Sequence, residues 1–257
     1  MLPPATRLYR YMPFEQFLRI VLTKKISAVL PQKWPDKYEL YWHKYLSTKE
    51  GSDILIKKVG QVISPAEFVE PTAEKLKNLI KASYQCIYAI CFSESGDEEL
   101  MWCAKNRDDK TIMISTTAAS LNQLGENNAI FGARLERVQY DLEERSNIDE
   151  LLNKMCFEPG TLIINEPSDL LLHKRKCFSY EKEVRMLYTP DDLKSLADEN
   201  GNIREAVDLD IPDIKEFIKG VMVCPSAEDR HVQLVKEVCD HFGINFQNKS
   251  DLYSFKI

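Results

Sequence analysis

The segment that most limits the choice of fold is "CIYAICFS", which runs from Cys86 to Ser93. It is apolar almost throughout and has the length of a strand rather than of a helix. A strand with so few polar residues is covered on both faces, so it lies in the middle of a buried sheet. We therefore expect a central, buried strand here, and the rest of the fold has to be built around it.

Further strands and helices follow one another in mixed order along the chain of 257 residues. The segment "TRLYRYM" alternates and is aromatic, which predicts a strand over 6–12. A helix follows it over 13–25, and the segments 110–116 and 131–142 again predict strands. No linker divides the chain. We therefore expect one α+β domain over residues 1–257, with a mixed, largely antiparallel β-core and flanking helices.

Composition excludes several classes of function. The net charge of -6 argues against a protein that grips nucleic acid by general electrostatics. No apolar run approaches the roughly 18 residues that cross a bilayer, and the first residues lack a signal-peptide pattern. We expect a cytoplasmic protein without a membrane partner. Its seven cysteines should all be free thiols because their spacing is irregular.

The common nucleotide, hydrolase and metal motifs do not occur. No G-x-G-x-x-G follows a strand, and neither a P-loop nor a G-x-S-x-G elbow is present. The four histidines show no spacing typical of a metal site, and no cysteine pair has C-x-x-C spacing. The sequence therefore predicts no bound metal, and any catalytic site must be built from less familiar patterns.

One such pattern lies in the segment "KCFSYEKEVRMLY", from Lys176 to Tyr188. It predicts a strand whose alternation puts Glu181, Glu183 and Arg185 on one face. Arg185 is a possible ion-pair partner for Glu183. Two interpretations stay open: the charged outer face of an edge strand, or the wall of a cleft. The cationic run that precedes it, within 173–176, predicts a solvated turn, with an anion-binding site as the alternative.

Three other positions are candidates for a site. Ser93 ends the buried strand beside an acidic loop, where polar groups are well placed for a ligand. Trp102 offers either a stacking surface or a core side chain. Arg10 stands between Tyr9 and Tyr11 in a strand. An arginine on an otherwise apolar strand face needs an anionic partner, which is either a carboxylate or a ligand phosphate.

Taken together, these segments resemble a bacterial domain family of unknown function. The matching residues are Tyr9-Arg10-Tyr11, Cys91-Phe92-Ser93, Leu100-Met101-Trp102, and Phe178 with Tyr180-Glu181-Lys182-Glu183-Val184-Arg185. The chain departs from the family at an early F-N-D-P-F-E-like turn. Its counterpart, "WPDKYE", keeps Asp36 and Glu39 but lacks the Asn before the Asp and the Pro after it. It also lacks the Tyr and Gly that follow M-W in the family.

The chain also resembles ADP-ribosyltransferases more distantly, in its strand–helix opening and in "YEKE". The resemblance implies NAD as substrate, with Arg10 holding the nicotinamide ribose or the pyrophosphate. It implies that Glu183 stabilises the oxocarbenium-like charge and that Glu181 orients or deprotonates an acceptor, whose identity stays open. The residues that would shape the NAD pocket are Tyr9, Tyr11, Ser93, Trp102, Tyr180 and Arg185. A toxin or phage-defence role would suit such a protein.

Two hypotheses from other classes remain. One is a ligand-binding or sensor module in which Arg10, Glu183 and Arg185 form a buried structural network. The other is a metal-dependent nuclease that uses Asp36, Glu39 and the two glutamates of "YEKE", although no lysine completes a D…E-x-K arrangement. Binding of NAD would separate the transferase from both.

Overall fold

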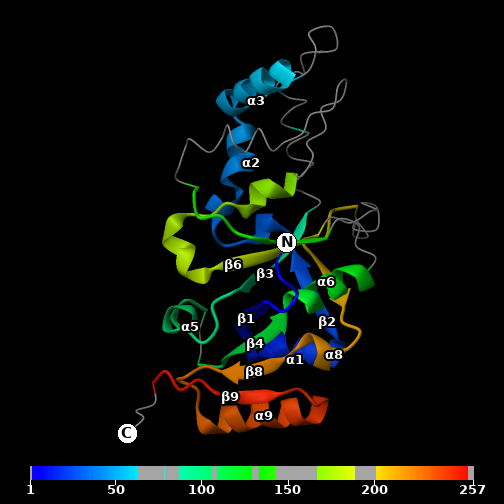
Figure 1. Ribbon diagram of the computed structural model, residues 1–257, viewed down its shortest axis with the longest axis vertical. Helices are drawn as coiled ribbons and strands as arrows, with labels where there is room; N and C mark the ends of the chain where they lie inside the picture. Colours follow the sequence, from blue (N-terminus) through cyan, green and yellow to red (C-terminus); the bar gives the residue numbers. More distant parts are fainter. Residues whose placement is uncertain are drawn as a thin grey trace.

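A computed structural model describes residues 2–62, 78, 87–105, 109–128, 133–142, 167–188 and 201–253. The strands within these ranges form one sheet (Figure 1). They are β1 (Arg7–Pro13), β2 (Lys25–Val29), β3 (Tyr88–Ser93), β4 (Thr111–Thr117), β5 (Arg134–Arg137), β6 (Glu183–Tyr188), β7 (Ala206–Asp210), β8 (Gly220–Val223) and β9 (Phe246–Lys249).

The order of the strands places β3 at the centre. The main path is β5-β6-β3-β1-β4-β8-β9, and β2 pairs with both β3 and β7. All these pairs are antiparallel except β8 with β9, which are parallel. The predicted mixed, largely antiparallel β-core with flanking helices is therefore confirmed, and so is the central position of the apolar strand.

Helices pack on the faces and at the ends of this sheet. They are α1 (Phe14–Thr23), α2 (Tyr41–Leu46), α3 (Lys49–Val62), α5 (Glu99–Lys105), α6 (Ala118–Asn127), α8 (Ile214–Phe217) and α9 (Asp229–Phe242). Short 3-10 helices are η1 (Pro31–Lys33), η2 (Lys37–Leu40), η3 (Pro167–Leu172) and η4 (Lys176–Glu181). None of the helices in the described ranges is long and apolar enough to span a bilayer.

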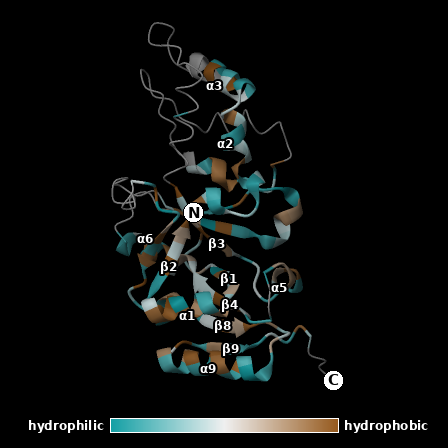
Figure 2. Cartoon of the chain, turned by 180° about the vertical axis from the view of Figure 1, so that it is seen from behind, coloured by the Kyte–Doolittle hydropathy of each residue, from teal (hydrophilic) through white to brown (hydrophobic). Residues whose placement is uncertain are grey.

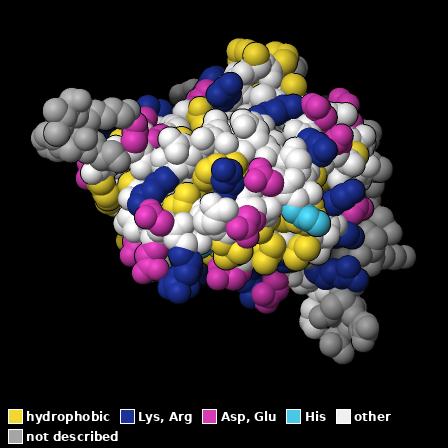
Figure 3. Space-filling view, turned by 90° about the horizontal axis from the view of Figure 1, so that it is seen from below, with side chains coloured by type: hydrophobic (Ala, Val, Ile, Leu, Met, Phe, Trp, Pro, Cys, Tyr) yellow, Lys and Arg dark blue, Asp and Glu magenta, His cyan; other side chains and the backbone are white. Residues whose placement is uncertain are grey.

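Two of these helices show how the pattern of the sequence fixes their packing. Hydrophobic and hydrophilic residues are mixed along α1 and α9 (Figure 2), and only one side of each is buried, through Phe17 and Ile20 in α1 and Val235 in α9. α9 ends at Gly243, which adopts the left-handed conformation with φ of 65°. Glycine reaches this conformation without steric cost, so it stops the helix. Viewed from the α9 end, Lys and Arg side chains are interspersed with Asp and Glu (Figure 3).

The two faces of the central strands differ in character. On one face Ile90 and Phe92 of β3 join Val184 of β6 in the main hydrophobic core. On the other face a smaller cluster contains Ala89 of β3 and Leu187 of β6. This second face turns polar toward the start of β6, and there the candidate site lies.

The predicted strand over Lys176–Tyr188 is wrong in its first half. Residues Lys176–Glu181 form η4, and only Glu183–Tyr188 form β6. Between them Lys182 has a φ of 39° and donates its backbone N–H to Ser179 O at 3.2 Å. A left-handed residue cannot continue an extended strand, so the alternation of faces begins only at Glu183.

The described cysteines are free thiols, as predicted. They are Cys91, Cys103, Cys177, Cys224 and Cys239. Cys86 and Cys156 lie outside the described residues, so the prediction for those two stays untested.

Candidate functional site

A cavity of about 250 Å³ lies where β1, β3 and β6 adjoin. Its walls combine four aromatic residues with six charged ones. The lining residues are Tyr9, Arg10, Tyr11, Trp34, Pro35, Glu39, Cys91, Phe92, Ser93, Met101, Lys105, Lys174, Glu181 and Glu183.

Strand register brings three of these residues together. Tyr9 of β1 lies opposite Ser93 of β3, and Ser93 lies opposite Glu183 of β6. Arg10 follows Tyr9 and lines the same cavity. The prediction that Arg10, Ser93 and Glu183 surround one cleft is therefore confirmed.

Arg10 is the cation of the cavity that no carboxylate balances. Its Nη1 donates to Cys91 O at 2.9 Å, and its guanidinium lies 5.9 Å from the centroid of the Phe92 ring. Within the described part of the chain, it forms no ion pair, and its buried Nε has no hydrogen-bond partner. Burial lowers the pKa of the Arg10 guanidinium. A half-buried cation with unused donors has capacity for an anionic ligand.

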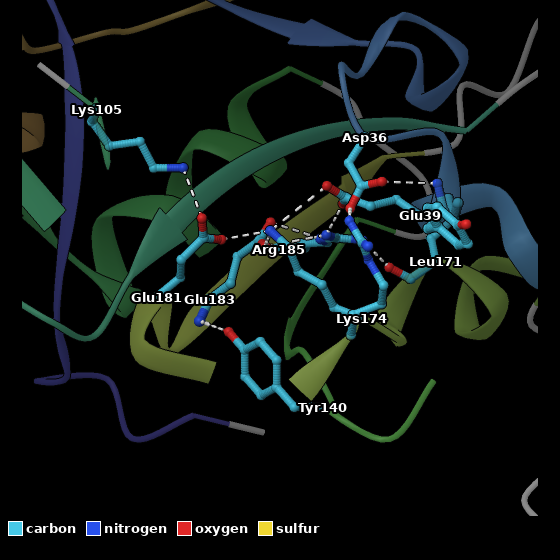
Figure 4. Close-up of polar contacts among 11 residues, drawn as sticks. Asp36, Glu39, Lys105, Tyr140, Leu171, Lys174, Glu181, Glu183 and Arg185 are labelled. Carbon is cyan, nitrogen blue, oxygen red and sulfur yellow. Dashed lines mark hydrogen bonds and ion pairs between the residues drawn. The ribbon is translucent and has the colours of Figure 1, made fainter. Parts of the chain in front are cut away.

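Lys174 is the centre of a network of carboxylates on the other side of the cavity (Figure 4). Its Nζ lies 2.5 Å from Glu181 Oε2, 2.9 Å from Glu183 Oε2 and 3.6 Å from Glu39 Oε1. The segment that carries it is held by Gln139, whose carbonyl accepts from Lys174 N at 2.8 Å. Burial disfavours the charged ammonium, but the surrounding carboxylates outweigh it and raise the pKa of Lys174.

Arg185 lies fully buried beneath the cavity floor and completes the network. Its Nε donates to Glu183 Oε1 at 2.8 Å, and its Nη2 reaches both Glu183 Oε2, at 3.1 Å, and Glu39 Oε2. Its Nη1 donates to Leu171 O. Its guanidinium lies 4.3 Å from the ring centroid of Trp34. The expected pairing of Glu183 with Arg185 is confirmed.

These contacts keep Glu183 ionised. Burial opposes ionisation of this carboxyl, but the charges and hydrogen bonds of Arg185 and Lys174 outweigh it and hold the pKa of Glu183 well below its usual range. Burial has the larger effect on Glu39 and raises the pKa of its carboxyl. The backbone N–H of Glu183 also donates to Tyr140 Oη at 2.7 Å. The carboxylate of Glu183 is therefore both charged and fixed in place.

Glu181 reaches the same network from η4 rather than from the strand. Its Oε1 accepts from Lys105 Nζ at 3.0 Å. Its backbone carbonyl accepts from Ser93 Oγ at 2.6 Å, and Ser93 Oγ in turn accepts from Ser95 N at 2.8 Å. The Ser93 hydroxyl thus fixes the backbone that carries Glu181.

Three residues assigned to the NAD pocket lie outside the cavity lining. Trp102 packs edge-on against Tyr11, with ring centroids 4.8 Å apart, and donates its Nε1 to Asp97 Oδ1 at 2.6 Å. Tyr180 lies in η4, where its carbonyl accepts from Ser95 Oγ at 3.3 Å. Arg185 lies below the cavity. Trp102 thus supports the Tyr11 wall from behind.

Lys174 and Lys105 are the charged site residues that sequence reasoning missed. The cationic run was predicted to be a solvated turn, which is wrong for Lys174, because its side chain is 7% exposed. Burial of this lysine depends on Glu39, from a distant segment, and on the path of the chain that returns Glu181 and Glu183 to it, which no local pattern reveals. For Lys105 a signal was available. This lysine ends the segment "ELMWCAK", whose Met101 also lines the cavity, so its place after the M-W motif could have marked it as a site residue.

The carboxylates proposed for a metal are taken by cationic side chains. Asp36 Oδ2 lies 3.0 Å from Arg175 Nη2, and its Oδ1 accepts from Tyr38 N at 3.0 Å. Glu39 is engaged by Arg185 and Lys174. Among the described residues, no group of three or more His, Cys, Asp and Glu has the arrangement of a metal site.

No protein-family model matches the chain, and no curated protein matches it. Solved structures of Thermus sp. 2.9 DarT do align with it. The complex with ADP-ribosylated ssDNA is 9% identical with a TM-score of 0.39, covering 98% of this chain and 97% of that chain. The alignments with the complexes that contain NAD+ and carba-NAD+ each show 10% identity and the same TM-score, and they cover 98% of the DarT chain. Because the TM-score is so low, we take the function from the cavity alone.

Proposed function

We propose that the cavity binds NAD and that the protein is an NAD-dependent ADP-ribosyltransferase. The observation that carries this proposal is the unbalanced guanidinium of Arg10 inside an aromatic-walled cavity. In the network Glu39, Glu181 and Glu183 are matched by Lys105, Lys174 and Arg185, so Arg10 is the charge in excess. A phosphate supplies the missing anion, and Arg binds phosphate through two parallel hydrogen bonds.

The aromatic walls suit the rest of such a ligand. Tyr9 and Tyr11 come from β1, Phe92 from β3 and Trp34 from the end of η1. Flat rings of this kind bury the faces of a nicotinamide or a base. A cavity of about 250 Å³ encloses only part of a dinucleotide, so we expect the nicotinamide ribose inside and the adenosine outside.

The carboxylate of Glu183 has the charge that the reaction needs. When the glycosidic C–N bond breaks, nicotinamide leaves with the bonding electron pair and positive charge develops on the ribose. An ionised, fixed carboxylate stabilises that charge, which is worth about 3–4 kcal/mol per group at such sites. The acceptor then forms the new bond to the ribose, and its proton passes to Glu181.

Titration calorimetry with NAD, run beside an assay of nicotinamide release, tests the proposal. Wild-type protein should bind NAD and release nicotinamide, with more release when protein or nucleic-acid acceptors are added. Protein that neither binds NAD nor releases nicotinamide across these acceptors would make the assignment untenable.

A second candidate is a sensor that binds the nucleotide without cleaving it. It is favoured by the full engagement of Glu183, whose two oxygens contact Arg185 and Lys174. Such a network is also a means of holding a unique structure. Tight NAD binding with no nicotinamide release, with or without acceptors, would select this candidate over the transferase.

A further inference from the structure

Lys105 differs from every other charged member of the network by its exposure. Its side chain is 40% exposed, whereas those of Lys174, Glu181 and Glu183 are 6–7% exposed and that of Arg185 is fully buried. Figure 4 shows it approaching Glu181 from the side opposite to Lys174 and Arg185. It is thus the outermost cation of the network and lines the cavity.

The position of Lys105 is set by its helix rather than by its ion pair. Met101 and Trp102 of α5 are buried, and they fix the helix against β1. Lys105 is the last residue of that helix, and its side chain extends from there to Glu181 Oε1. Release of the ion pair would therefore leave the helix and the root of the side chain in place.

We infer that Lys105 exchanges Glu181 for a phosphate of the nucleotide when the ligand binds. This inference rests on the proposed function in its choice of ligand, a nucleoside diphosphate such as the ADP-ribose part of NAD. Lys174 is held by buried carboxylates, so Arg10 and Lys105 are the two cations of the cavity that could turn to a ligand, which matches a diphosphate rather than a single carboxylate.

The exchange costs little on the side of the protein. Lys105 is 40% exposed, so solvent screens its ion pair with Glu181 and reduces what that pair contributes to stability. Glu181 keeps its second partner, because Lys174 Nζ lies 2.5 Å from Oε2, so no buried carboxylate loses its counter-charge. The diphosphate as a whole carries more charge and more acceptor atoms than the single carboxylate that it replaces.

The exchange has a consequence for the proposed chemistry. In the ligand-free protein both oxygens of Glu181 are occupied, Oε1 by Lys105 and Oε2 by Lys174. Once Lys105 turns to the phosphate, Oε1 is free to accept the proton of an acceptor. The nucleotide thereby prepares the carboxylate that the second substrate requires.

Calorimetric titration with sodium pyrophosphate, ADP-ribose and nicotinamide tests the role of Lys105. Lys105→Gln should weaken pyrophosphate and ADP-ribose by about five- to tenfold and leave nicotinamide unchanged. The matched control is Lys219→Gln, because Lys219 is 36% exposed and pairs with Glu216 at 2.7 Å far from the cavity. It should change none of the three affinities by more than about twofold.

A double-mutant cycle separates exchange from mere attraction. Glu181→Gln removes the competitor for Lys105 and should tighten pyrophosphate binding, and this gain should vanish in the Lys105→Gln background. Equal pyrophosphate affinity in wild type and Lys105→Gln would overturn the inference, as would a gain from Glu181→Gln that persists without Lys105. If NAD fails to bind while pyrophosphate binding still depends on Lys105, the proposed function falls and the inference stands.

Discussion

Ser93 lies directly opposite Glu183 in the pairing of β3 with β6, yet its hydroxyl donates to the backbone carbonyl of Glu181. One short polar side chain at the end of the central strand thus connects the strand that carries one glutamate with the 3-10 helix that carries the other. The two carboxylates reach a common cavity from different elements because Ser93 holds those elements together.

Replacing Ser93 with Ala should lower the free energy of unfolding by about 1–3 kcal/mol. The substitution leaves the carbonyl of Glu181 and the N–H of Ser95 without their partner in a buried environment. Ser115→Ala is the matched control, because this buried strand serine makes only a long 3.4 Å hydrogen bond to Gly220 O. Urea unfolding measures both, and equal losses would contradict the special role of Ser93.

Arg10→Met should abolish NAD binding without lowering the melting temperature. A half-buried guanidinium with no ion pair among the described residues stabilises the fold little, so its replacement by an apolar side chain of similar length is tolerated. Arg137→Met is the control, because Arg137 pairs with Glu94 at 2.7 Å on the exposed side of β5. Retention of wild-type NAD affinity in Arg10→Met would exclude Arg10 as the anion-binding residue.

Glu183→Gln should affect both stability and turnover. Glu183 is the buried partner of Arg185 and Lys174. Loss of its charge should cost about 3–5 kcal/mol, whereas Glu216→Gln, at an exposed pair, should cost less than about 1 kcal/mol. Nicotinamide release should fall by about 10²–10³-fold. It must be measured at a temperature where the variant is folded, and release at the wild-type rate there would contradict the role of Glu183.

The stability of the protein should fall below pH 6.5 because of His43 in α2. This side chain is fully buried, and burial lowers its pKa from 6.5 to about 3. Between these values the unfolded chain binds a proton that the folded protein does not, so the free energy of unfolding falls by about 1.4 kcal/mol per pH unit as the pH decreases. His43→Gln should remove this component, and His241→Gln, at an exposed position, should retain it. Urea unfolding at pH values from about 4 to about 7 measures the free energy of unfolding of wild type and both variants. If this free energy changes with pH by the same amount in all three proteins, the role of His43 is disproved.

The sheet could be predicted largely because strands with strong local patterns form its centre. The apolar run of β3 and the aromatic alternation of β1 are local patterns that predict buried strands without any knowledge of their neighbours. The break at Lys182 could not be read, because a lysine gives no signal for a left-handed conformation that tertiary contacts impose. Short strands such as β7 and β9 are largely exposed, so their pairing depends on neighbours rather than on a pattern of burial.

The ion pair within β6 was predictable from the sequence, whereas the contacts that other segments make to it were not. Glu183 and Arg185 are two residues apart on one face of β6, which is why their pairing followed from the alternation. Lys174 meets them from a loop nearby in the chain and Glu39 from η2, far away in the chain, and local pattern alone does not bring these segments together. The interpretation of 173–176 as a solvated turn failed for this reason.

The sharing of counter-ions in the network also limits how the sequence can evolve. Loss of Glu39, Lys174, Glu183 or Arg185 leaves a buried charge short of a counter-ion, since Lys174 contacts three carboxylates and Arg185 contacts two. Drift at positions 39, 174, 183 and 185 must therefore be concerted, with compensating changes fixed together or not at all. Arg10 and Lys105 lie outside this constraint, so lineages that change ligand can alter those two positions while the frame beneath them persists.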